Sequence, residues 1–121
     1  MENYAYQIIQ KLTDLQNHTK ASWLENYVKH GIKSKGVGIP QIRKLLIKEV
    51  NNSSLKGESI QNQIKFLNTL MYSIFTEDKL AAVLYLQIFW NQVSSQTKIN
   101  LISSWFDQRY IFDWNVCDWL C

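Results

Sequence analysis

The sequence has few of the residues that make tight turns or covalent cross-links: one proline, four glycines and two cysteines in 121 residues. So little glycine and proline argues against a sandwich or barrel of many short strands, because such folds need frequent tight turns. Cys117 and Cys121 are too few for a disulfide framework, and their spacing is not that of a Cys-x-x-Cys zinc knuckle. We interpret them as reduced thiols of a cytoplasmic protein.

Long apolar runs are also missing. The longest, Leu80–Leu86, has seven residues, whereas a membrane-spanning helix needs ~20. The N-terminal stretch carries Glu2 where a secretory signal peptide has cations, and its apolar residues alternate with polar ones. We therefore expect a cytoplasmic location and no membrane partner.

What the sequence does contain is helical periodicity. Hydrophobic residues make up 46% of the chain, enough for a core, and they recur at intervals of three and four, which is typical of amphipathic helices. No segment with the period of a strand competes with this pattern. The expected helices are Tyr4–Leu15, Thr19–Val28, Pro40–Val50, Ile60–Met71, Thr76–Val93, a helix from Ser94 or Ser95 to Trp105, and a last helix that begins at Asp113.

These seven short helices predict an all-α fold. Helical pairs of ~35–45 residues fit three HEAT-like repeats, and an irregular helical bundle is the alternative. The helix that begins at Thr76 is apolar on nearly every side, so we expect it to lie in the centre. Thr76 is expected to cap that helix, with Glu77 and Asp78 in its first turn.

Charge is unevenly distributed along the chain. The net charge is only +3, but residues 29–48 hold six of the thirteen cations and no acid. A glycine-rich loop there precedes a helix, and the free N–H groups at a helix start favour anions. The segment predicts a site for DNA phosphates; a solvated helix face is the alternative. The candidate DNA-binding residues are Lys33, Lys35, Gly38, Arg43, Lys44 and Lys48.

The C-terminal stretch holds the candidate catalytic residues. Trp114 and Asp118 are four residues apart, which places both on one face of a helix. An electron-rich indole beside a carboxylate suits a cationic ligand or a developing positive charge. The alternative is a core tryptophan near a capping or surface aspartate.

Three segments together resemble the AlkD-like DNA alkylation repair family, the HEAT-like alkylpurine DNA glycosylases. NYVKHGIKSKGVGIPQIRKLL is similar to the family's N-terminal segment, EDKLAAVLYLQ to its acidic, alanine-rich buried helix, and DWNVCD to its Trp-Asp-x-Val-Asp segment. The matching residues are Tyr27, Val28, Lys29, Gly36, Val37, Pro40 and Arg43 in the first segment and Trp114, Val116 and Asp118 in the last, where Asn115 replaces an aspartate.

The resemblance implies an enzyme that hydrolyses the N-glycosidic bond of alkylated purines in double-stranded DNA. Asp118 would stabilise an oxocarbenium-like sugar and activate water, and Trp114 would pack on the sugar or the cationic base. The basic loop and helix would bind backbone phosphates. The family is thought to act without fully flipping the base, and no metal or organic cofactor is implied.

The resemblance covers only the N-terminal half of such a protein, so we expect residues 1–121 to be the N-terminal portion of a HEAT-like domain and an incomplete solenoid. Three hypotheses about function follow. The chain is an active glycosylase, or the N-terminal half of one that is inactive in this short form; it is a non-catalytic helical module that binds DNA or protein; or it is a remnant that self-associates through its apolar C-terminal end.

Overall fold

A computed structural model describes residues 2–19, 21 and 33–110 of the chain. Within these residues the fold is all-α, as predicted, and the helices pack against one another in the manner of helical repeats. The predicted helices that begin at Thr19 and Asp113 fall mainly or wholly outside the described residues. The elements described are α1 (Glu2–Asp14), α3 (Ile39–Asn51), the short 3-10 helix η1 (Leu55–Gly57), α4 (Ile60–Tyr72), α5 (Thr76–Phe89) and α6 (Ser95–Asp107).

The helix boundaries follow from local chemistry. Pro40 lies in the first turn of α3, where its missing N–H does no harm. Ser59 and Ser94 cap α4 and α6, and each side chain accepts from the backbone N–H of the third helical residue. Both starts agree with the predicted ones.

Two predicted details of α5 are wrong. Phe75, not Thr76, occupies the N-cap position. Thr76 is the first helical residue, and its N–H donates to the carbonyl oxygen of Lys33 at 2.9 Å. The helix ends at Phe89 rather than at Val93. Trp90 is its C-cap, and polar residues then lead to the start of α6.

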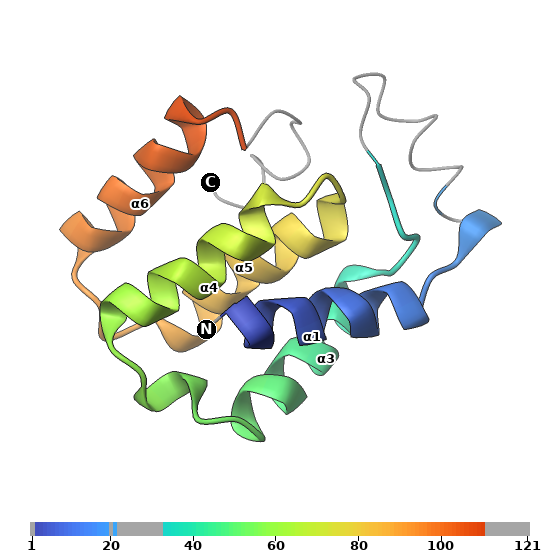
Figure 1. The fold of residues 1–121 in the computed structure, drawn as a ribbon, viewed down its shortest axis with the longest axis horizontal. Helices are drawn as coiled ribbons and strands as arrows, with labels where there is room; N and C mark the ends of the chain where they lie inside the picture. Colours follow the sequence, from blue (N-terminus) through green and yellow to red (C-terminus); the bar gives the residue numbers. More distant parts are fainter. Residues whose placement is uncertain (1, 20, 22–32, 111–121) are drawn as a thin grey trace.

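Helix α5 is the centre of the molecule, as its sequence predicts. Every residue from Thr76 to Leu86 is buried. Helix α4 precedes it after a three-residue turn, so the two lie side by side and antiparallel (Figure 1). Helices α1 and α3 pack against this pair and each other, and α6 lies at the edge of the fold, to the left in Figure 1.

Two tryptophans hold the helices together through their indole N–H groups. Trp90 and Tyr85 both donate to the Gln63 side-chain oxygen on α4, at 2.8 and 2.6 Å. Burial raises the pKa of Tyr85 to about 12, so the phenol remains a donor throughout the physiological range. Trp105 of α6 is fully buried and donates to the Asn68 side-chain oxygen on α4 at 2.8 Å.

The chain between α1 and α3 runs close to other backbone at Gly36. Its φ is +71°, in the left-handed region, and a Cβ atom there would lie 2.0 Å from the carbonyl oxygen of Asn17 and 2.8 Å from the backbone nitrogen of Ala21. Both facts require glycine at this position. Gly57, at the end of η1, has open space where a Cβ atom would be.

We therefore predict opposite effects for two glycine substitutions. Gly36→Ala should lower the free energy of unfolding by at least about 2 kcal/mol, because it adds both left-handed strain and a backbone clash. Gly57→Ala should leave it unchanged or raise it by up to about 1 kcal/mol, since it restricts only the unfolded chain. Urea unfolding of both variants checks this; equal stabilities would contradict the assigned role of Gly36.

Candidate nucleic-acid interface

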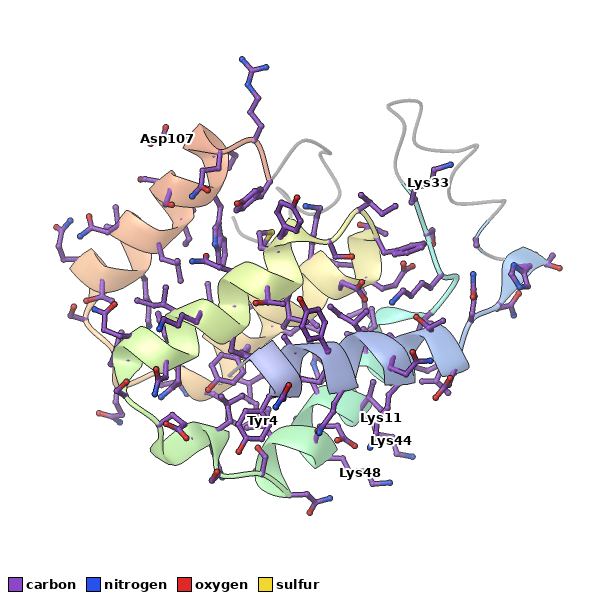
Figure 2. All side chains as sticks on the ribbon, viewed as in Figure 1. Tyr4, Lys11, Lys33, Lys44, Lys48 and Asp107 are labelled. Carbon is purple, nitrogen blue, oxygen red and sulfur yellow. The ribbon has the colours of Figure 1, made fainter. Side chains whose placement is uncertain are left out.

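The cations of residues 29–48 do not form one continuous patch. Lys44 and Lys48 are exposed and one turn apart on the outer face of α3. In Figure 2 they lie near Lys11 of α1, whereas Lys33 lies at the opposite end of the loop. Lys29 lies outside the described residues. Among the described residues, the structure therefore divides the predicted basic region into Lys44 and Lys48 (the α3 cluster), the separate exposed cations Arg43 and Lys33, and the internal Lys35.

The α3 cluster borders a groove between the end of α1 and the outer face of α3. The groove has a volume of about 310 Å³. We call this groove, with Lys11 beside it, the basic face. No acidic side chain lines the groove, and its lining combines apolar and amide or ammonium groups: Leu15, Gln41, Lys44, Leu45 and Lys48.

Lys11 is a member of the basic face that the sequence did not indicate. It lies on α1, and its Nζ atom is 2.6 Å from the Glu49 Oε1 atom on α3. The side chain of Lys11 remains 47% exposed, so its ammonium stays accessible from solvent. Only the packing of α1 on α3 brings it near the other two lysines, and no spacing along the chain signals that packing.

The start of α3 offers fewer free donors than the loop-and-helix pattern predicts. Gly38 is the N-cap, and its N–H donates to the Gln41 side-chain oxygen at 3.3 Å. Pro40 has no N–H. Arg43 is exposed, but it lies about 100° around the helix from Lys44. Side chains of the basic face, rather than the helix start, are the available anion-binding groups.

Lys35 has a different environment from the other candidates. Its side chain is 1% exposed. The ammonium nitrogen is 2.8 Å from Asp78 Oδ1 and donates to the carbonyl oxygen of Ile9 at 2.9 Å, and it lies 4.9 Å from the centre of the Phe75 ring. Since these partners enclose it, Lys35 joins α1, the loop and α5 and is not placed to contact DNA.

The acids at the start of α5 bind the same loop. Glu77 accepts from the Ser34 hydroxyl and from the Lys35 N–H, both at 2.7 Å. We call Ser34, Lys35, Glu77 and Asp78 the α5 clasp. The sequence assigned the two acids to the helix dipole, but their main partners lie 42 and 43 residues earlier in the chain.

Burial raises the pKa of Asp78, although the bonds from Lys35 and from the Ser73 hydroxyl oppose that rise. A raised pKa means that the folded protein binds this proton more tightly than the unfolded chain does. The contribution of Asp78 to stability is therefore full below its unfolded-state pKa and is lost as the pH rises through the folded-state value.

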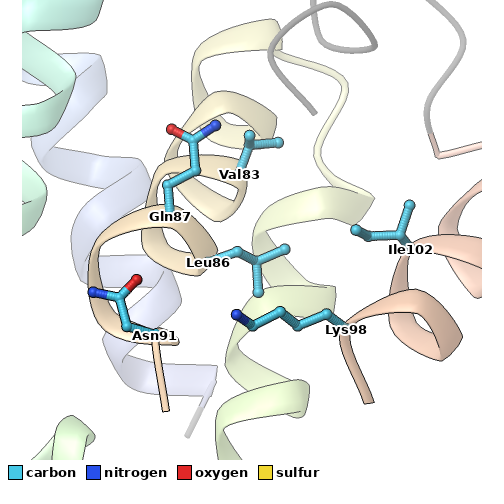
Figure 3. A pocket seen from close by; sticks show the side chains of 6 residues that line it. All are labelled: Val83, Leu86, Gln87, Asn91, Lys98 and Ile102. Atoms are coloured by element: carbon cyan, nitrogen blue, oxygen red, sulfur yellow. The ribbon is translucent and has the colours of Figure 1, made fainter. Parts of the chain in front are cut away.

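A second groove lies between α5 and α6 (Figure 3). Its volume is about 200 Å³, which is below the range of about 300–1,000 Å³ usual for small-molecule sites. Figure 3 shows Lys98 of α6 extending toward Leu86 of α5 across it. Lys98 is the one cation among the residues that line this groove.

The predicted catalytic residues Trp114 and Asp118 lie outside the described residues. Among residues 2–19, 21 and 33–110, no group of three or more His, Cys, Asp or Glu side chains could hold a metal ion. Over the same part of the chain, no helix is long and apolar enough to cross a membrane.

Comparison with known proteins gives one family-level finding. The model of a family described as DNA alkylation repair enzyme matches residues 8–121. No curated protein and no solved structure matches the chain.

The α5 clasp makes a testable prediction about stability. Lys35→Met should cost about 3–5 kcal/mol at pH 7, because it leaves the Asp78 carboxylate buried without its counter-charge. The cost should shrink at pH 5, where the carboxyl group can take up a proton instead. Lys35→Met combined with Asp78→Leu should recover most of the loss.

Lys11→Met is the matched control, because it breaks an ion pair at the surface. It should cost no more than about 1 kcal/mol. Urea unfolding of the wild type and the three variants at both pH values measures these differences. Similar losses for Lys35→Met and Lys11→Met would show that the buried pair has no special weight.

Proposed function

This chain belongs to the DNA alkylation repair enzyme family, and on that premise we propose that it acts in DNA repair as a glycosylase, or as the N-terminal portion of one, that removes alkylated purines. The observation that carries the proposal is the family match over residues 8–121, a span that includes Trp114 and Asp118. The basic face on α3 supports it, because exposed lysines without an acid in the groove suit a phosphate backbone.

The proposed reaction needs little assistance to the leaving group. A purine alkylated on a ring nitrogen is cationic, and it departs as a neutral base with the electron pair of the C1′–N bond. The sugar is left as an oxocarbenium-like cation. Water then adds to C1′, and the carboxylate of Asp118 takes the proton. Trp114 contributes the electron-rich face of its indole against the cationic sugar or base.

The basic face would hold the duplex while this happens. Lys44 and Lys48 would contact backbone phosphates, with Lys11 beside them, and Arg43 and Lys33 would add contacts elsewhere on the surface. We leave Lys35 out of this set because its ammonium is enclosed. The proposed substrate is double-stranded DNA, and the proposed chemistry requires no metal or organic cofactor.

A non-catalytic DNA-binding module is the second candidate, favoured by the same basic face. Both candidates bind DNA, and only the first releases a base. Self-association through the C-terminal end and a cytoplasmic location stay predictions; size-exclusion chromatography over a range of concentrations tests the first of these.

Base release tests the catalytic proposal. Duplex DNA treated with a methylating agent is incubated with the full chain, and free methylated purines are measured by chromatography. We expect Asp118→Asn to slow release by about 100-fold or more, because it removes the proposed base. Asp107→Asn, an exposed acid at the end of α6, is the matched control and should keep the wild-type rate.

The results separate the two candidate functions. Full activity in Asp118→Asn would remove that residue from the mechanism. DNA binding by a wild-type chain that releases no base would support the non-catalytic module.

Salt dependence tests the basic face. The double variant Lys44→Gln/Lys48→Gln should lower the slope of log affinity against log salt by roughly 2, because each lost phosphate contact removes about 0.9. Lys65→Gln, an exposed lysine on α4, is the control and should leave the slope unchanged. Fluorescence anisotropy with a labelled duplex at several salt concentrations gives the slopes, and an unchanged slope in the double variant would exclude this face.

A further inference from the structure

The end of α6 is a defined corner. Gln108 is the C-cap, and Arg109 follows with φ +59° in the left-handed region. The Arg109 N–H donates to the carbonyl oxygen of Phe106 at 3.0 Å, and the Tyr110 N–H donates to that of Trp105 at 2.9 Å. This pair of bonds is a Schellman motif. It ends the helix at a fixed angle and gives Tyr110 a definite position.

Tyr110 is held on its other side by α4 and α5. The buried Lys79 of α5, 2% exposed, donates from Nζ to the carbonyl oxygen of Tyr110 at 2.5 Å and to that of Met71 at 2.6 Å. The Tyr110 ring meets the Tyr72 ring edge to face, with centres 5.8 Å apart. We call Lys79, Tyr72 and Tyr110 the corner anchor.

The residue type of Lys79 is informative. An aliphatic side chain would fill the same space without taking an ammonium group out of water, which is costly. What lysine adds is a charged donor that reaches two carbonyl oxygens of different elements. Met71 lies in the last turn of α4, where a helix favours a cation, so one ammonium joins the end of α4 to the residue after the α6 corner.

The chain that leaves this corner carries the proposed catalytic residues. Trp114 is four residues and Asp118 eight residues beyond Tyr110. Eight extended residues span at most ~28 Å. The position of Tyr110 therefore limits where the carboxylate of Asp118 can lie. We propose that Lys79 is a positioning residue of the glycosylase: with Tyr72 it fixes Tyr110, and thereby the origin of the segment that bears Trp114 and Asp118. This inference rests on the function proposed above.

The first test measures the anchor itself. Amide hydrogen exchange of Arg109 and Tyr110 is followed by NMR in the full chain. Lys79→Met should speed their exchange by about tenfold or more, because a charge-assisted bond to the corner is lost. Leu55→Ala is the control: it removes buried side-chain volume in η1, away from the corner, and should leave those two amides at the rate that its overall stability predicts.

The second test measures base release under single-turnover conditions. Lys79→Met should lower the maximal rate by about 100-fold, the scale expected for small errors in catalytic geometry. Its affinity for DNA should stay within about twofold of wild type, because the ammonium is internal and makes no phosphate contact. If Lys79 had only a structural role, Lys79→Met would instead reduce the rate and the affinity together. Leu55→Ala is expected to do this, in proportion to the fraction of protein that it unfolds.

A third variant covers the case in which Lys79→Met does not fold. Tyr72 is 73% exposed, so Tyr72→Leu leaves the core intact while removing the ring that packs against Tyr110. Like Lys79→Met, it should speed amide exchange at Arg109 and Tyr110 and slow base release.

The outcomes separate this inference from the proposed function. Wild-type exchange at Tyr110 in Lys79→Met, or in Tyr72→Leu if the first variant is unfolded, overturns the anchor. An unaltered single-turnover rate in a folded Lys79→Met, or an equal loss in Leu55→Ala, overturns the positioning role. A wild-type chain that releases no base overturns the glycosylase and its positioning role together, while the exchange result still decides whether the anchor exists.

Discussion

The buried ion pair between Lys35 and Asp78 is the interaction on which the arrangement of the described helices depends. Two charges removed from water are tolerated only when both are bonded on several sides. Here the ammonium also binds the carbonyl oxygen of Ile9 and the carboxylate also binds the Ser73 hydroxyl. Those requirements fix α1, the loop before α3 and the start of α5 relative to one another. The basic face is formed by α1 and by α3, the helix that follows this loop.

Much of the fold could be predicted from local pattern. The starts of α3, α4 and α6 follow from one proline and two serines, and the buried sequence of α5 indicated a central helix. The α5 clasp could not be predicted in this way, because its partners are 42 and 43 residues apart and neither periodicity nor capping rules extend over such a separation. From the sequence alone Lys35 cannot be distinguished from the neighbouring cations, because its counter-charge, Asp78, lies on a distant helix.

The candidate site shows the same division. Lys44 and Lys48 could be found from charge and helical spacing alone, since both properties are local to α3. Lys11 could not, because only the packing of α1 on α3 brings it there. The burial of Lys35 could not be foreseen either, because burial depends on the tertiary fold. Trp90 and Trp105 show that an indole in this protein can be a bonded core element. The role of Trp114 therefore stays a prediction based on family resemblance.

The α5 clasp also bears on how the polypeptide is made. Helices α4 and α5, separated by three residues, can pair as soon as both exist, whereas joining Lys35 to Asp78 closes a far longer loop and contributes to a slower step. Synthesis proceeds from the N-terminus, so α1, the loop and α3 are made before either acid of the clasp has been added. Until α4 and α5 emerge, Lys35 remains hydrated, and the apolar sides of α1 and α3 lack the helices on which they mainly pack. The nascent chain is therefore most exposed to proteases and chaperones in that interval, and the arrival of α5 ends it.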